Sequence, residues 1–416
     1  MSKIILEKGK TGSNTLGGYE KVSALVGYFG TASNGVNVLA LDTPLEFRNV
    51  AELEVYGITP ELKPLLYRRI SEYFRMAGTG ARLWLLSLTQ PQTPTFADMI
   101  ATQAIKAMIA NADGQIFQVG FCYIPTAAPT YVNGLPDYII AAIQAAQTFA
   151  DWCRTTNRPV HTILECAYYN APAAAAQNLR NIQIDSTTLQ APQVSVVIGQ
   201  DWTFADTLTD GEKNHAAVGE VLGCMAAQPV SYNIGEVATM VLTNAPRNLW
   251  ITAGFSNHIK VKDSEADLPT LEDKGYIFGE YYEGNVCFNN DHNCTPVIVD
   301  DEGNMNEHSI AISRTNAKVF REIYRVFLQK LKMTVAVDAQ TGLLPVGTRK
   351  YFEGLGNRIF ENMTARQEVS GGETTVDAQS NLLFGDKILK VFYNWVPMGV
   401  VGRIHGIINI KKSLQQ

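Results

Sequence analysis

The residues closest to a metal-binding pattern are Cys287, His292 and Cys294, which stand within eight positions of one another. Cysteine and histidine are the usual ligands of zinc in proteins. The spacing matches none of the common finger or ribbon patterns, and no fourth ligand is evident. Cys122, Cys166 and Cys224 lie in apolar surroundings, which favours reduced core thiols. We therefore expect no metal and no other cofactor.

The histidines and carboxylates do not form a hydrolytic pattern either. The six histidines include no pair at positions i and i+4, the spacing that places two ligands on one helix face. His161 and His405 lie within predicted strands, where we expect structural roles. The acidic run from Asp300 to Asn304 lacks the alternating ligands of a calcium loop and is typical of a solvated turn.

Motifs for cofactors and nucleophiles are also missing from the sequence. The glycines of Gly78-Thr-Gly80 precede a predicted strand and lack the third glycine of a dinucleotide-binding turn. Neither a phosphate-binding loop nor a nucleophile elbow occurs. At the predicted strand ends, Asp201 is the one plausible general base, and the sequence indicates no partner for it. We expect that the protein is not an enzyme.

Composition sets the scale of the fold. The chain has 416 residues, 46% hydrophobic and 18% charged, which indicates a globular protein of two or three domains. No apolar run reaches the roughly 20 residues needed to cross a bilayer, and the first ten residues do not resemble a signal peptide. The expected location is the cytoplasm, without membrane insertion.

Helices and strands alternate between residues 60 and 230. Alternation of this length indicates βαβ units and a mainly parallel sheet with helices on both faces. The fold class is thus α/β over residues 21–235, followed by a C-terminal α+β domain. Helices are predicted at 61–76, 96–110, 137–153, 173–181 and 215–226, and strands at 82–88, 116–123, 160–167 and 194–198.

The later part of the chain is less regular. Strands are predicted at 249–255 and 276–288, and helices at 313–333 and 351–366. The first of these helices has an apolar side and an opposite basic stripe, which we interpret as a docking face for an acidic partner, with a solvated helix face as the alternative. The stripe consists of Arg314, Lys318, Arg321, Arg325 and Lys332.

Two strands are predicted at the C-terminus, each with strict alternation of period two. In 388–396 the odd positions are apolar: Leu389, Val391, Tyr393 and Trp395. In the second run the even positions, from Val400 to Ile410, are apolar or glycine. Glycines permit close approach of another backbone, so this strand is a candidate for pairing with a neighbouring molecule, although an edge strand of the chain's own sheet is also possible.

Charge is unevenly distributed. Residues 1–305 hold 19 Lys and Arg against 31 Asp and Glu, whereas residues 306–416 hold 15 against 9. Opposite net charges within one chain favour complementary surfaces on copies of the same molecule or on a fixed partner. A chance distribution of charge over a solvated surface is the alternative. The basic part shows no motif with interleaved aromatic residues, so we expect no nucleic-acid binding.

Four stretches resemble the contractile tail sheath proteins of phages and phage-derived injection systems, in particular a Mu-like or Bacteroidetes-type branch. These stretches are Val22–Gly27, Val194–Asp201, Ala216–Ala227 leading into Val230–Gly235, and Trp395–Ile410. The resemblance lies in the order of these stretches along the whole chain and in their short, apolar character. Residues 236–305 match nothing in that family, and we expect an acidic, β-rich insertion or outer segment there.

The resemblance implies a structural function. Subunits of this family form stacked rings around a tail tube, and contraction drives the tube through a target envelope without nucleotide hydrolysis. Residues 1–20 would be an N-terminal arm and 306–416 an assembly domain that interlocks with neighbours. The implied arm strands contain Ile4, Ile5 and Leu6 near the N-terminus, and Val400, Val401, Ile404, Gly406, Ile407, Ile408 and Ile410 in the terminal strand at 399–411.

The implied partners are other copies of the chain, the tail tube protein, and baseplate and sheath-terminator proteins. The strand at 388–396 would receive a neighbour's arm, and the basic helix face would meet the tube or the next ring. Assembly is expected in the bacterial cytoplasm, within a phage tail or tail-like particle. Two alternatives remain open: a cytoplasmic α/β enzyme centred on Gln200 and Asp201, and another phage-like structural component.

Overall fold

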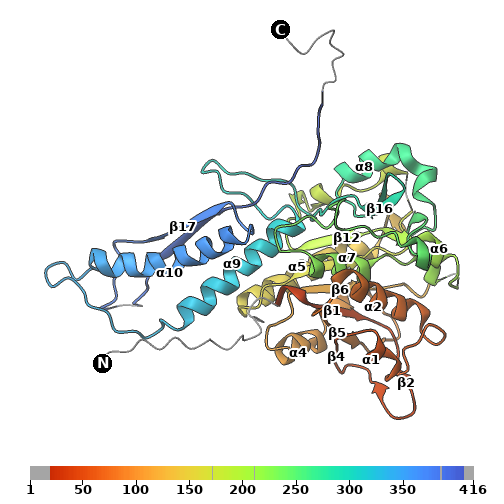
Figure 1. Cartoon of the computed structure of the whole chain (residues 1–416), viewed down its shortest axis with the longest axis horizontal. Coiled ribbons are helices and arrows are strands. Elements are labelled where there is room, and N and C mark those ends of the chain that lie inside the picture. The colour runs from red at the N-terminus through yellow and green to blue at the C-terminus, as the bar shows by residue number, and fades with distance from the viewer. Residues whose placement is uncertain (1–18, 171, 210, 385–386, 407–416) are drawn as a thin grey trace, which may run out of the picture. The chain divides into compact units, whose positions relative to one another are not determined.

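The structure is a computed structural model that describes residues 19–406 apart from 171, 210 and 385–386. The arm residues Ile4, Ile5, Leu6, Ile407, Ile408 and Ile410 lie outside the described residues. The chain divides into two compact units, one formed by residues up to 230 together with 234–328, the other by 231–233 and 329–416. Figure 1 shows the elements of both units.

Unit 1 is built on a six-stranded sheet in the order β12-β9-β6-β1-β5-β4 (Figure 1). All neighbours are parallel except β4 and β5. The α/β prediction is therefore confirmed. The strands are β1 (Val22–Gly27), β4 (Leu45–Phe47), β5 (Arg82–Ser87), β6 (Gln118–Cys122), β9 (His161–Glu165) and β12 (Val194–Val197).

Helices cover both faces of this sheet, as two adjacent residues of β6 demonstrate. A Cβ on Gly120 would lie 2.5 Å from Val218 of α7 (Val218–Ala227). The next residue, Phe121, packs edge-on against Phe149 of α5 (Tyr138–Thr155) on the opposite face. Successive strand residues point to opposite faces, so α7 and α5 lie on opposite sides of the sheet. Helix α2 (Pro64–Ala77) packs against α7.

Apart from α9, the remaining elements of unit 1 are short. The helix predicted at 96–110 is broken at Ala101 and Thr102 into α3 and α4, and the one predicted at 173–181 is wrong, since two 3₁₀ turns lie there. The helices are α1 (Ala51–Glu54), α3 (Phe96–Ile100), α4 (Gln103–Asn111), α6 (Trp202–Ala205), α8 (Leu268–Asp273) and α9 (Ile310–Leu328). The paired strands are β2 (Ala32–Ser33) with β3 (Val38–Leu39), β7 (Tyr131–Val132) with β8 (Leu135–Pro136), β10 (Gln183–Ile184) with β11 (Thr187–Thr188), β13 (Gly199–Asp201) with β14 (Ala253–Phe255), and β15 (Gly279–Tyr282) with β16 (Asn285–Phe288).

The segment 236–305 is not an outer insertion. Trp250, Phe278 and Phe288 are almost completely buried and belong to the same core cluster as the central strands. Backbone pairing joins it to the body as well, since β13 pairs with β14. The predicted start of the C-terminal domain at residue 306 also differs from the structure, because α9 belongs to unit 1.

Unit 2 contains one helix and one hairpin. Helix α10 (Val346–Ala365) packs on β17 (Gly371–Val376), which pairs antiparallel with β18 (Val391–Val396). Close contact between α10 and β17 depends on two glycines. A Cβ added at Gly356 would lie 2.2 Å from Thr374, and one added at Gly372 would lie 2.6 Å from Phe360. The β18 side chains alternate as predicted, with 391, 393 and 395 half-buried and 392, 394 and 396 exposed.

We expect Gly219→Ala to destabilise unit 1. An added Cβ would lie 2.1 Å from the carbonyl oxygen of Arg69, which is main chain and cannot rotate away. Overpacking of this kind costs about 1–3 kcal/mol and sometimes more, measurable by urea unfolding. Gly354→Ala in α10 is the control, because nothing lies within 4 Å of its added Cβ; equal losses in both variants would contradict the packing argument.

Candidate functional site

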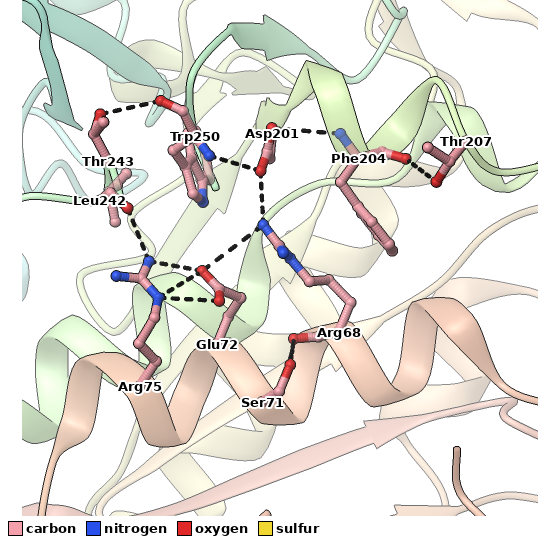
Figure 2. A network of polar contacts seen from close by, with 10 residues as sticks. All are labelled: Arg68, Ser71, Glu72, Arg75, Asp201, Phe204, Thr207, Leu242, Thr243 and Trp250. Atoms are coloured by element: carbon pink, nitrogen blue, oxygen red, sulfur yellow. Dashed lines mark hydrogen bonds and ion pairs between the residues drawn. The ribbon is translucent and has the colours of Figure 1, made fainter. Parts of the chain in front are cut away.

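Asp201, the candidate general base, lies at the end of β13 with its carboxylate occupied by structural partners (Figure 2). Oδ2 accepts a hydrogen bond from Arg68 at 2.6 Å and another from the backbone N–H of Trp250 at 2.8 Å. Oδ1 accepts from the N–H of Phe204 at 3.4 Å and so caps α6. A carboxylate with these three partners is a bridge between segments and is not presented to a substrate.

The same network ties α2 to the segment 242–250 (Figure 2). The carboxylate of Glu72 forms an ion pair with the guanidinium of Arg75 at 2.7 Å, and it lies 3.9 Å from the guanidinium of Arg68. Arg75 also donates to the carbonyl of Leu242 at 2.9 Å. Buried charges are tolerated only when paired and hydrogen-bonded, and here each α2 cation faces a carboxylate.

A second buried pair lies at the carboxyl end of β9. Arg69 of α2 binds Glu165, which also accepts the N–H of Ala216 at 2.9 Å. Glu165 is fully buried, and burial raises the pKa of its carboxyl although Arg69 opposes the shift. The strand end that an α/β enzyme uses for substrate is thus partly filled by an internal ion pair.

Glu220 is a buried carboxyl in the first turn of α7. Its pKa is raised to about 7, mainly by burial and in addition by the nearby Glu72, whereas Arg68 opposes the shift. Burial, together with the like charge of Glu72, explains why Glu220 holds its proton more tightly than an isolated glutamate does.

The candidate histidines and cysteines are also buried among other residues of the protein. His161 is buried between Ser313 at 3.0 Å and Ser195 at 3.1 Å, and burial lowers its pKa to about 3. His292 contacts Glu272 at 3.1 Å. Cys287 and Cys294 are buried free thiols. Among the described residues, no cluster of three or more His, Cys, Asp or Glu has the geometry to hold a metal ion.

The predicted basic stripe is not a continuous exposed face of one helix, because α9 ends at Leu328 and Lys332 lies beyond it. Arg314 is completely buried, and Lys318 is buried beside Glu20 at 2.5 Å. Arg321 donates to three carbonyls that precede β6 and β9, those of Gly114, Ile116 and Pro159. The exposed-stripe prediction is therefore wrong at Arg314 and Lys318. Arg325 and Lys332 are exposed, and for these two a docking role stays a prediction.

The C-terminal run differs from the strand that its alternation predicts. Residues 399–406 form no strand in this chain. Val400, Val401 and Ile404 are 57%, 78% and 89% exposed. Within the described residues, β17 and β18 pair as strands only with each other. On the outer edge of β17, the N–H groups of Thr374 and Val376 donate to the side chains of Asn357 and Glu353 in α10. Phe392 and Val396 add apolar surface to the exposed side of this hairpin.

The fold is that of tail sheath proteins. The sheath tail protein of Desulfitobacterium hafniense matches with a TM-score of 0.51 at 11% identity, over 96% of this chain and 100% of that one. A chain in the six-fold symmetrised baseplate of the anti-feeding prophage matches with a TM-score of 0.57 at 12% identity, over 100% of this chain and 99% of that one. At such identities the likeness establishes the fold.

The family model described as DUF2586, N-terminal domain, matches residues 9–286, and the chain belongs to this family. The match extends through most of 236–305, in agreement with the packing of that segment into the core. No curated protein sequence matches the chain. In the part of the chain that the structure describes, no helix combines the length and the hydropathy of a membrane span.

We expect Glu220→Gln to become more favourable relative to wild type as pH rises. A carboxyl whose folded pKa is raised contributes stability below its unfolded pKa, and this contribution is lost as pH rises toward the folded value. The difference in unfolding free energy, Gln minus Glu, should grow between about pH 4.5 and pH 7 and then level off. Urea titrations across that pH range measure this difference in unfolding free energy. Glu61→Gln is the control, because Glu61 is exposed. A difference that does not change with pH would contradict the raised pKa of Glu220.

Proposed function

We propose that this protein is a structural subunit of a contractile tail sheath, which polymerises as stacked rings around a tail tube. Contraction of the sheath drives the tube through a target envelope without nucleotide hydrolysis. The observation that carries the proposal is the agreement of fold over essentially the whole chain with a sheath tail protein. Shared fold alone does not specify function, so the argument also rests on the surface of unit 2.

The C-terminal segment has the properties of a strand awaiting a partner. It alternates with period two and bears exposed apolar side chains at Val400 and Ile404, and its described residues, 399–406, make no strand pairing. Among the described residues, β18 pairs with no strand other than β17, so its outer edge is the proposed place for such a strand. Strand addition from one subunit to the next supplies backbone hydrogen bonds that persist while the subunits rotate.

From this arrangement we infer the partners of the protein. Copies of the chain associate through arms and hairpins, with β18 as the receiving strand. The tail tube lies inside the sheath, and baseplate and sheath-terminator proteins bound it at its ends. The particle assembles in the bacterial cytoplasm, where opposite charges of residues 1–305 and 306–416 favour contact between copies.

A second candidate is another structural component of the same kind of particle. It is favoured by the fold match to a chain of a baseplate. The two candidates differ in geometry, since a sheath extends as a helical polymer whereas a baseplate protein forms a closed ring.

We expect deletion of residues 399–416 to leave a folded monomer that forms no long polymers, as measured by sedimentation. Two double variants provide a matched comparison. One combines Val400→Ser with Ile404→Ser, and the other combines Arg403→Ser with His405→Ser. The first pair removes the apolar face of the strand and should abolish polymers, whereas the second changes the polar face and should retain them. Normal polymers from the deletion variant would exclude the arm assignment.

Negative-stain electron microscopy of the full chain, alone and co-expressed with its genomic neighbours, tests the assembly itself. We expect hollow striated sleeves or stacked rings. Single closed rings attached to a baseplate would favour the second candidate, and discrete particles under every condition would contradict both.

A further inference from the structure

A hairpin loop of unit 1, here called the 297–305 loop, bears apolar side chains on its solvent face. Val299 and Met305 pair antiparallel, and residues directly opposite each other in such a pair share a face. Val297, two positions before Val299, points to the same side. Val297, Val299 and Met305 are 57%, 58% and 46% exposed, whereas Ile298 between the valines is half-buried. The loop thus presents an apolar face to solvent.

Polar side chains of the loop itself hold its turn in one conformation. The Asp300 carboxylate accepts hydrogen bonds from the N–H groups of Glu302 at 3.0 Å and Asn304 at 2.7 Å, and from the Asn304 amide at 2.8 Å. At the base of the loop, the Asn306 amide donates to the carbonyl of Pro296 at 2.8 Å. A surface that is ordered before it binds loses little conformational freedom on binding.

Negative charge lies at the tip of the same loop. Asp300, Asp301 and Glu302 are consecutive and exposed. An interface is favourable when charges of opposite sign meet across it. A partner that fits the loop must therefore offer an apolar or aromatic surface next to a basic one.

The outer face of α10 in unit 2 has this combination. Phe352, Ile359 and Phe360 are buried, so residues on the other side of the helix face solvent. Those exposed residues follow at helical spacings and are Lys350, Tyr351, Gly354 and Arg358. Tyr351 is 43% exposed and supplies the aromatic surface. Glu361 follows one turn after Arg358 and ends the basic part of this face.

Gly354 is the residue of this face that contacts within the chain do not explain. It lies in the middle of α10, and nothing described lies within 4 Å of a Cβ added there. Glycine inside a helix is destabilising relative to alanine, so its presence calls for a reason. Close approach of another backbone is such a reason, and it would come from outside this chain.

We propose that the 297–305 loop of one copy docks on the outer face of α10 in a second copy. This inference rests on the proposed function, because the contact joins neighbouring subunits. Val299 and Met305 pack against Tyr351, and the backbone of the loop crosses the helix at Gly354. A second copy is the favoured partner because the chain itself carries both of the complementary surfaces.

The charged residues meet when the apolar ones do. Val297 and Asp301 are about 13 Å apart along an extended strand, and Tyr351 and Arg358 are about 10 Å apart along a helix. An acidic tip thus reaches the basic residue once the apolar face covers the tyrosine. Lys350 already forms an ion pair within its own helix at 2.7 Å, so Arg358 is the cation that we expect to decide the contact.

Disulfide trapping between variants with one added cysteine each tests the contact. Val299→Cys and Tyr351→Cys are purified separately, mixed and oxidised. We expect a covalent heterodimer that neither variant gives alone, because the six native cysteines are buried. Val36→Cys mixed with Tyr351→Cys is the matched control and should give none, since Val36 is 84% exposed in a different loop of unit 1.

Charge reversal provides a second measurement that needs no cross-link. Arg358→Glu and Glu302→Arg should each weaken self-association about tenfold in sedimentation, and the two variants mixed should recover most of it. Arg366→Glu is the control, because Arg366 is an exposed basic residue that follows the end of α10; it should leave the association unchanged.

The outcomes separate this contact from the sheath function. Sleeves in the microscope without the heterodimer would overturn the contact and leave the sheath function standing. A heterodimer without sleeves would retain the contact and contradict the sheath function, and absence of both would overturn both. A cross-link formed within one chain that carries both cysteines, independent of protein concentration, would also overturn the proposal.

Discussion

The pairing of buried charges along α2 is the constraint on which unit 1 depends. This helix sends Arg68, Arg69 and Arg75 into the interior, toward carboxylates at Asp201, Glu165 and Glu72. Removing one partner of a buried pair leaves an uncompensated charge and costs about 3–5 kcal/mol. The helix is therefore fixed in position relative to β9, β13 and the segment 242–250, which come from distant parts of the chain.

Close backbone contact makes this pairing possible. The glycines at 219 and 223 allow α7 to approach α2 until an added Cβ would lie 2.1 Å and 2.7 Å from the nearest α2 atoms. Short arginine-to-carboxylate distances require that the helix lies this near to the strand ends. Packing and electrostatics thus reinforce each other in the body of unit 1.

Unit 2 follows a different principle. Its hairpin is covered by α10 on one side, while Phe392 and Val396 remain exposed on the other. Isolated two-stranded hairpins are marginal in water, and clustered exposed apolar side chains mark interaction sites. Exposed apolar residues continue beyond β18 in Val400, Val401 and Ile404. The body is complete in one chain, whereas the hairpin and tail have the composition of a structure completed by a neighbour.

The sequence by itself determined the α/β body, because alternating helical and strand periods are local properties that each segment carries in its own residues. It also determined the alternation of half-buried and exposed side chains in β18. The known catalytic motifs could likewise be searched for in the sequence alone. It did not reveal the partner of Asp201, since Arg68 lies 133 residues away and no local pattern links them. The stripe on α9 was misleading for the same reason. Arginine and lysine at helical spacing predict a solvated face, but Glu20 and the carbonyls at 114, 116 and 159 lie there in the tertiary structure and bind them. Local periodicity fixes which elements form, and long-range contact decides which charges are buried and which remain available to a neighbour.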